Sequence, residues 1–167
     1  MENKKIKNII NEMVDAGITR DHIESMKNRD VEYLNNPPPY YSKIKKSNEL
    51  KLIPVEKIKG LSSARFDNKK NIYELFFSEY KNTNLVAHIR INENLNSLIS
   101  NGLEYQYDFY NDPLNKSHRF KLPQFKHLQD DDIYIVEDAT HRTISAIMFT
   151  APTMIGDVSQ YKVDEEK

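Results

Sequence analysis

The chain has no cysteine, no tryptophan and only 4 glycines among its 167 residues. Without cysteine there are no disulfides, no thiolate ligands for a metal and no chemistry that depends on a reactive thiol. The glycine-rich phosphate loops are missing too, because neither a Walker A sequence nor a G-x-G-x-x-G sequence occurs. No zinc-ligand spacing is present. Any phosphate or metal chemistry must therefore use other residues.

Long apolar runs and an excess of one charge are also absent. No segment approaches the length that spans a membrane, and the amino terminus lacks the apolar core of a signal peptide. Lys and Arg total 24 against 25 Asp and Glu, which leaves a formal net charge of −1. This balance does not indicate DNA binding, although it leaves that function open. We expect a cytoplasmic protein with no membrane partner.

The clearest pattern is the stretch DIYIVEDATHRTISAIMFT at residues 132–150. Residues 133–136 form an apolar run of strand length that is rich in β-branched side chains. Further on, Ile144, Ile147 and Met148 fall at i, i+3 and i+4, which is one face of a helix. The polar residues between the two patterns suit a turn or a helix N-cap. The stretch therefore predicts a strand, a tight turn and a helix.

The first turn of the predicted helix carries His141, Arg142 and Thr143. Unpaired backbone N–H groups and the helix dipole attract an anion to such a place, and an arginine fork matches phosphate or carboxylate. The alternative is that Arg142 only pairs with an acidic neighbour such as Glu137 or Asp138, and that the joint binds nothing. The residues alone leave both interpretations open.

Three fragments together resemble the ParB/sulfiredoxin-like superfamily. The turn A-T-H-R-T-I-S-A at residues 139–146 is similar to the family's Gly-x-His-Arg turn between a strand and a helix. The fragment L-I-P-V-E-K-I at residues 52–58 resembles the strand that opens these domains, and residues 151–158 resemble the closing strand. The fragments occur in the family's order within residues 50–160. The chain departs from the family at Ala139, where the family has glycine, and the cysteine needed for sulfinic-acid reduction is missing.

The resemblance implies that the turn holds the phosphates of a nucleotide, such as ATP or CTP with Mg²⁺. Arg142 would bind phosphate as a fork, Thr140 and Thr143 would add hydroxyl donors, and His141 would donate a hydrogen bond or relay a proton. Glu137 or Asp138 would hold Mg²⁺ or act as a base. His141, Glu137 and Asp138 are thus the catalytic candidates, and no dedicated metal site is predicted.

Two functions remain open after these observations. The first is a nucleotide- or phosphate-binding ParB-like protein, which leaves open whether it also catalyses phosphoryl transfer or nucleotide hydrolysis. The alternative is a non-catalytic protein-interaction factor or DNA-associated accessory factor of a mobile element, with a protein partner bound through residues 1–46. Convergence of His141, Arg142 and an acid on one site would favour the first function.

The amino-terminal segment predicts a helical hairpin over residues 1–34, which either binds a partner or packs on the main domain. Its first helix, residues 3–15, has an apolar stripe formed by Ile6, Ile9, Ile10, Met13 and Val14. Thr19 suits the N-cap of a second helix, whose weaker apolar face is formed by Ile23, Met26, Val31 and Leu34. A proline-rich linker is expected at 35–48 and the ParB-like domain at 49–163.

The expected fold class is α/β (α+β), a small mixed sheet with flanking helices, ParB/sulfiredoxin-like and preceded by the hairpin. The acidic run at 130–132 suits a solvated turn or a Mg²⁺ ligand. The remaining predicted elements are a strand at Leu50–Ile58, a helix from Asn68 to about Tyr80 capped by Asp67, a strand at Leu85–Ile91, a short helix from Asn92 or Glu93 that stops at Gly102, and a strand at Leu103–Tyr110.

Overall fold

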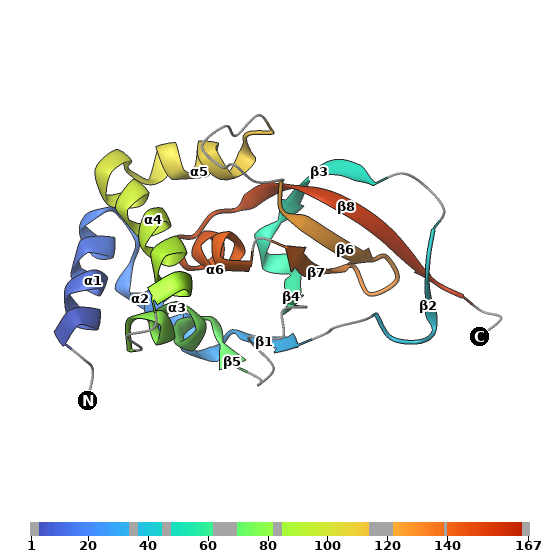
Figure 1. The fold of residues 1–167 in the computed structure, drawn as a ribbon, viewed down its shortest axis with the longest axis horizontal. Coiled ribbons are helices and arrows are strands. Elements are labelled where there is room, and N and C mark those ends of the chain that lie inside the picture. Colours follow the sequence, from blue (N-terminus) through green and yellow to red (C-terminus); the bar gives the residue numbers. More distant parts are fainter. Residues whose placement is uncertain are drawn as a thin grey trace.

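The computed structural model of the chain describes residues 4–33, 37–44, 48–61, 70–81, 85–113, 122–138 and 140–164. Within these residues the chain forms a mixed α/β structure, which confirms the expected fold class at that level. Figure 1 shows the helices gathered at one end of the molecule and the curled sheet extending beyond them. Among the described residues, no helix combines the length and the apolar character needed to cross a membrane.

The sheet is mixed, with the strand order β2-β8-β6-β7-β4-β1-β5, and β3 pairs with β8 as well. The pairs β1/β4, β4/β7 and β6/β8 are parallel, and the other pairs are antiparallel. The strands are β1 (Asp30–Tyr33), β2 (Tyr41–Lys43), β3 (Glu49–Pro54), β4 (Ile58–Leu61), β5 (Lys70–Asn71), β6 (Gln124–Leu128), β7 (Ile133–Asp138) and β8 (Thr153–Val163).

The helices are α1 (Lys4–Asp15), α2 (Arg20–Ser25), α3 (Ile72–Lys81), α4 (Leu85–Asn101), α5 (Leu103–Asn111) and α6 (Thr140–Met148), with short 3₁₀ turns η1 (Met26–Asn28) and η2 (Val55–Lys57). α6 is the helix that contacts α3, α4 and β7. Phe149, directly after α6, is fully buried and meets Phe76 of α3 edge to face at 5.7 Å between ring centroids. α6 is thus held by the core on several sides.

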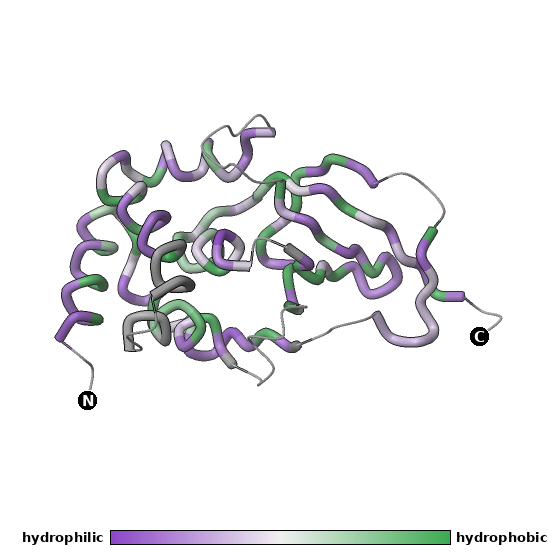
Figure 2. Tube along the Cα trace, in the orientation of Figure 1, coloured by the Kyte–Doolittle hydropathy of each residue, from purple (hydrophilic) through white to green (hydrophobic). Residues whose placement is uncertain are grey.

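The predicted amino-terminal helix is confirmed as α1. Its residues Ile6, Ile9, Ile10 and Met13 are buried and belong to the same apolar core as the sheet. Figure 2 shows hydrophobic residues alternating with hydrophilic ones along this helix. Because the core already covers these four residues, they are not exposed for binding another protein.

α2 begins as the sequence predicts. The Thr19 hydroxyl accepts a hydrogen bond from the His22 N–H at 3.1 Å, which is an N-cap. The His22 imidazole then reaches the Ile147 carbonyl on α6 at 3.1 Å, and burial lowers the pKa of His22. The helix stops at Ser25, so the prediction that Val31 continues its apolar face is wrong. Val31 lies on β1, where pairing with β5 takes it into the sheet.

Two segments near the predicted linker and opening strand also differ from expectation. Residues 41–43 form β2, which pairs with the last part of β8. The single strand expected at Leu50–Ile58 is instead two strands, β3 and β4, separated by η2. β3 ends at Pro54, and the η2 turn that follows sends β4 alongside β7. The predicted cap Asp67 lies outside the described residues, and α3 begins after Asn71, whose side-chain oxygen accepts from the Glu74 N–H at 2.8 Å.

The strands predicted at Leu85–Ile91 and Leu103–Tyr110 are both wrong, because α4 and α5 occupy these segments. In α4, Ile91, Leu95 and Leu98 are buried at i, i+4 and i+7, so the helical period of the later residues governs the whole segment. In α5 the buried positions are Gln106 and Tyr110, four residues apart. The alternating aromatic residues that suggested a strand do not share one buried face.

The central prediction holds. β7 and α6 form the strand and helix expected at residues 132–150, and β8 is the closing strand expected at 151–158, which extends to Val163. Ile144, Ile147 and Met148 are buried on α6. β6 lies in a segment for which the sequence pattern predicted no element, and its place between β7 and β8 completes the central sheet. The joint between β7 and α6 is therefore part of the centre of the fold.

Candidate functional site

The carboxyl ends of three parallel strands meet at one edge of the sheet. Tyr33 at the end of β1 is opposite Leu61 at the end of β4, and Leu61 is opposite Val136 near the end of β7. α6 begins at this same edge, directly after β7. In open α/β sheets, ligands bind outside the carboxyl ends of the strands, where a helix N-terminus also favours anions. This edge is therefore the candidate site.

The first turn of α6 exposes its side chains to different degrees. Thr140 and His141 are 9% and 8% exposed, Thr143 is completely buried, and Arg142 is half-buried. No acidic residue lies in this first turn. Arg142 is therefore the residue of the turn best placed to meet a ligand from solvent. The buried Thr143 hydroxyl has no solvent contact in this conformation and supports the turn from behind.

Glu137 faces a different neighbourhood from the first turn of α6. Val136 lies in the helix-covered core, and because side chains alternate along a strand, Glu137 lies on the opposite face of the sheet. Its Oε1 is 3.8 Å from Nζ of Lys126, and its charge helps raise the pKa of Tyr161, which is raised mainly by burial. The side chain of Asp138 lies outside the described residues. The exposed Glu137 carboxylate therefore lies beside Lys126 on this face.

A buried polar network lies within electrostatic reach of Arg142. The Tyr110 hydroxyl donates to Asn94 Oδ1 at 3.1 Å and accepts from Gln106 Nε2 at 3.0 Å. The Ser97 hydroxyl donates to Gln106 Oε1 at 2.8 Å. Burial raises the pKa of Tyr110, and the positive charge of Arg142 acts in the opposite direction. This network joins α4 to α5 beside the site.

Sequence reasoning missed this network because it assigned residues 103–110 to a strand. The signal that could have identified it is the i, i+4 spacing of Gln106 and Tyr110, two polar side chains that share one helical face. Buried amide and hydroxyl groups require partners, and helix–helix packing supplies them here.

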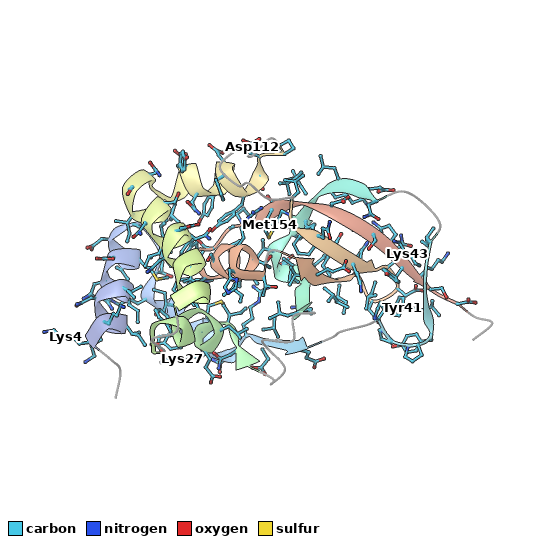
Figure 3. The ribbon with its side chains drawn as sticks, in the orientation of Figure 1. Lys4, Lys27, Tyr41, Lys43, Asp112 and Met154 are labelled. Carbon is cyan, nitrogen blue, oxygen red and sulfur yellow. The ribbon has the colours of Figure 1, made fainter. Side chains whose placement is uncertain are left out.

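The predicted acidic turn is occupied by specific contacts. Asp130 accepts from the Val163 N–H at 2.9 Å, and Asp131 accepts from the Tyr41 hydroxyl at 2.8 Å. Tyr41 belongs to β2, at the far end of the sheet (Figure 3). Burial and the Asp131 contact raise the pKa of Tyr41 to about 12. In the described part of the chain, no group of three or more His, Asp or Glu side chains is placed to hold a metal.

Asp132 links η2 to β6, and His127 extends these contacts to β7 and β8. It forms an ion pair with Lys57 of η2, and its Oδ1 lies 2.9 Å from His127 Nε2. The other ring nitrogen of His127 contacts Gln160 Oε1 at 2.8 Å, and the ring stacks on Tyr134 with centroids 4.2 Å apart. The bonds from Lys57 and His127 hold the pKa of Asp132 below its ordinary value.

We expect Asp132→Asn to lower the melting temperature at neutral pH. A carboxylate whose folded pKa is depressed stabilises the protein above its unfolded pKa, near 3.8, and that stabilisation is lost as the pH falls through the folded value. The difference between wild type and variant should therefore shrink below pH 3.8. Thermal melts across this range test it. Asp130→Asn is the matched control, because its amide oxygen still accepts from Val163; a pH-independent difference for Asp132→Asn would contradict the prediction.

A cavity of about 300 Å³ lies away from this edge, between α1 and α2. Lys7, Asn11 and Arg20 contribute to its lining, together with the apolar Ile10 and Ile23. Arg20 donates to Asn11 Oδ1 at 2.7 Å. The lining thus holds two basic side chains and one acidic side chain, Glu24. Because the basic pair could attract an anion, experiments on the β7–α6 edge need a control there.

Comparison with known proteins found no match to a family model, to a curated protein sequence or to a solved structure. The resemblance to the ParB/sulfiredoxin-like superfamily therefore stays a prediction from the sequence.

Proposed function

We propose that the edge formed by the carboxyl ends of β4 and β7 binds a phosphorylated ligand, a nucleotide such as ATP or CTP. The observation that carries this proposal is the position of α6. It begins at the carboxyl edge of parallel strands, with the half-buried Arg142 in its first turn and no acidic side chain there. Backbone N–H groups of the turn and the guanidinium would bind the phosphate oxygens together.

The other residues of the turn have supporting roles in this proposal. Thr140, at the start of α6, would add its hydroxyl at the edge, while the buried His141 and Thr143 would keep the turn in position. Mg²⁺ would be held largely by the phosphates, which matches its preference for few protein ligands. The exposed carboxylate of Glu137 would be the acid that approaches from the other face of the sheet.

Catalysis is the second part of the proposal. Nucleotide hydrolysis or phosphoryl transfer needs a base close to the attacking group, with Glu137, Asp138 and His141 as the candidates. Because the Glu137 carboxylate is exposed beside Lys126 while His141 is buried, the geometry supports binding more directly than turnover. A phosphate-release assay on any nucleotide that binds, with Glu137→Gln as the variant, separates a binding protein from an enzyme.

Thermal melts with ATP, ADP, CTP and GTP, each with and without Mg²⁺, test the binding. A ligand at about 100 times its dissociation constant stabilises the native state by about 2.7 kcal/mol. For a chain of this size that corresponds to a rise of roughly 5–10 °C in melting temperature. We expect at least one nucleotide to stabilise the wild type and to lose most of that effect in Arg142→Ala.

Arg20→Ala is the matched control, because Arg20 is exposed and lines the α1–α2 cavity. It should keep the full nucleotide response. Loss of the response in Arg20→Ala with retention in Arg142→Ala would move the anion site to the cavity and contradict the proposal. An unchanged melting temperature with all four nucleotides would also contradict it.

The alternative function is a non-catalytic protein-interaction or DNA-associated accessory factor, and one observation favours its protein-interaction form. Leu50 and Leu52 are 54% and 55% exposed on β3, which is unusual for neighbouring apolar side chains on one strand face. A partner bound through residues 1–46 would have to use surfaces other than the buried stripe of α1. DNA binding that is strong at low salt and falls steeply with added salt would support the DNA-associated form.

A further inference from the structure

β3 is an edge strand whose outer side has no partner strand within the described residues. It pairs with β8 along its whole length, and Figure 1 shows it on the outer side of β8. An edge strand presents a row of free N–H and C=O groups, which is a template for another strand. Many proteins shield such an edge with a covering segment or a bulge.

The backbone groups that face outward belong to Leu50 and Leu52. The Val55 N–H donates to the Pro152 carbonyl at 3.1 Å, which continues the antiparallel ladder between β3 and β8. Hydrogen-bonded positions alternate in such a ladder, so Ile53 and Lys51 also direct their groups toward β8. The groups of the two leucines therefore point away from the sheet.

The side chains of the same two residues are also exposed. Leu50 and Leu52 are 54% and 55% exposed, and they lie on one face of β3 because they are two residues apart. Leu52 is opposite Ile155 of β8, which is 9% exposed. Outward-facing backbone groups and exposed leucines thus occur at the same positions. An added strand would form hydrogen bonds with these backbone groups and cover part of the exposed leucine side chains.

We propose that this added strand is β3 of a second copy of the chain, paired antiparallel across a two-fold axis. A two-fold interface must be self-complementary, so each residue of the strand meets a defined residue of its copy. Pairing centred on Leu50 places Leu50 opposite Leu50 of the second copy. The outward-facing backbone N–H and C=O groups of the two residues then face each other. The two sheets would then form one continuous sheet through the interface.

Charge selects this register over its neighbours. Centring on Leu50 places Glu49 opposite Lys51 of the second copy, and Lys51 opposite Glu49. Centring on Lys51 would oppose two lysines, and centring on Glu49 would oppose two glutamates, and like charges directly opposite each other are unfavourable. Within one chain Glu49 Oε2 is already 3.3 Å from Lys51 Nζ, and both side chains are about half exposed. They are therefore available to the second copy.

The dimer should be weak and concentration-dependent, because one short strand pair buries less area than a stable interface needs. The test is sedimentation velocity of the full chain over a concentration series. We expect reversible self-association of the wild type. Leu50→Lys, which places two lysines across the axis, should leave a monomer with an unchanged circular dichroism spectrum, since Leu50 is exposed in the monomer.

Charge exchange tests the register. Lys51→Glu places glutamates opposite each other at both ends of the pair, and Glu49→Lys places lysines there, so each variant alone should dimerise about tenfold more weakly. An equal mixture of the two variants places every lysine opposite a glutamate and should restore association. The double variant Glu49→Lys/Lys51→Glu should restore it as well.

Three outcomes would overturn the proposal. One is a wild type that stays monomeric up to millimolar concentration. Another is a dimer that persists unchanged in Leu50→Lys and in both charge variants. The third is rescue of Lys51→Glu by the wild type as fully as by Glu49→Lys, which would indicate pairing centred on Lys51, because both partners keep Lys51 opposite the new glutamate.

Discussion

Phe149→Ala is expected to lower the free energy of unfolding by about 3–5 kcal/mol, the usual loss for a fully buried phenylalanine. Phe149 is 0% exposed and follows α6 directly, and its ring meets Phe76 of α3 edge to face. Its N–H also donates to the Ser145 carbonyl at 2.8 Å, so the residue closes the helix. Removing the ring leaves a cavity between α3 and α6 that the surrounding elements cannot fill without moving.

Urea unfolding of wild type and variant measures this loss of free energy. In thermal melts, the same loss should lower the melting temperature by about 10 °C. Tyr105→Ala is the matched control, because Tyr105 is also aromatic but 50% exposed on α5. It should change stability by less than about 0.5 kcal/mol. A Phe149→Ala variant as stable as this control would show that α6 is not held by the core.

Gly156→Ala is the second substitution with a large expected effect. Gly156 lies in β8 between β3 and β6, and a Cβ there would be 2.6 Å from two ring atoms of Phe125 and 2.9 Å from Cδ1 of Ile53. Both neighbours are fully buried, so neither side chain can move into solvent. We expect a loss of about 1–3 kcal/mol, as for other overpacked cores.

A double-mutant cycle identifies the cause of that loss. Phe125→Leu alone should destabilise by leaving space in the core, and Gly156→Ala should be less costly in the Phe125→Leu background than in the wild type. The two changes should therefore be non-additive by more than about 0.5 kcal/mol. Additive losses would mean that contact between Phe125 and the new methyl group is not the source of the strain.

These two substitutions also separate stability from binding. Neither Phe149 nor Gly156 belongs to the first turn of α6, where a ligand is proposed to bind. Both variants should therefore keep the rise in melting temperature that a nucleotide produces, measured from a lower starting value. Arg142→Ala should show the opposite behaviour, with the starting value little changed and the rise lost.

Local sequence patterns identified the elements whose signals are contained in one short segment. The β-branched run before Glu137 and the helical spacing of Ile144, Ile147 and Met148 identified β7 and α6 because strand and helix periods differ clearly there. The Thr19 cap was identified in the same way, since a hydroxyl three residues before a free N–H is a purely local arrangement.

Local patterns failed for the first part of α4 and for α5, whereas the helix predicted from Asn92 or Glu93 to Gly102 is confirmed as the later part of α4. The residues 103–110 alternate aromatic and polar side chains, which fits a strand as well as a helix when seen alone. Packing decided the matter, because Gln106 and Tyr110 find hydrogen-bonding partners on α4 only when α5 is helical. Tertiary contacts of this kind override weak local preferences.

The same distinction between local sequence pattern and tertiary packing applies to the candidate site. Thr140, His141, Arg142 and Thr143 were placed together by sequence, because consecutive residues of one helical turn cannot be far apart. Which of them reach solvent was decided by packing, which buries Thr143 and leaves Arg142 half-exposed. Strand alternation then placed Glu137 on the face of the sheet that carries Lys126, a residue of another strand.

The sequence by itself determined a mixed α/β chain with a strand–turn–helix at its centre, because hydrophobic periodicity and capping act over a few residues. Only the tertiary structure decided which strands meet at the ligand edge, how Asp132 joins Lys57 to His127, and that β3 lies at the edge of the sheet with Leu50 and Leu52 exposed. These features depend on contacts between segments far apart in the chain. Such contacts are set by the packing of the whole core, so no local pattern records them.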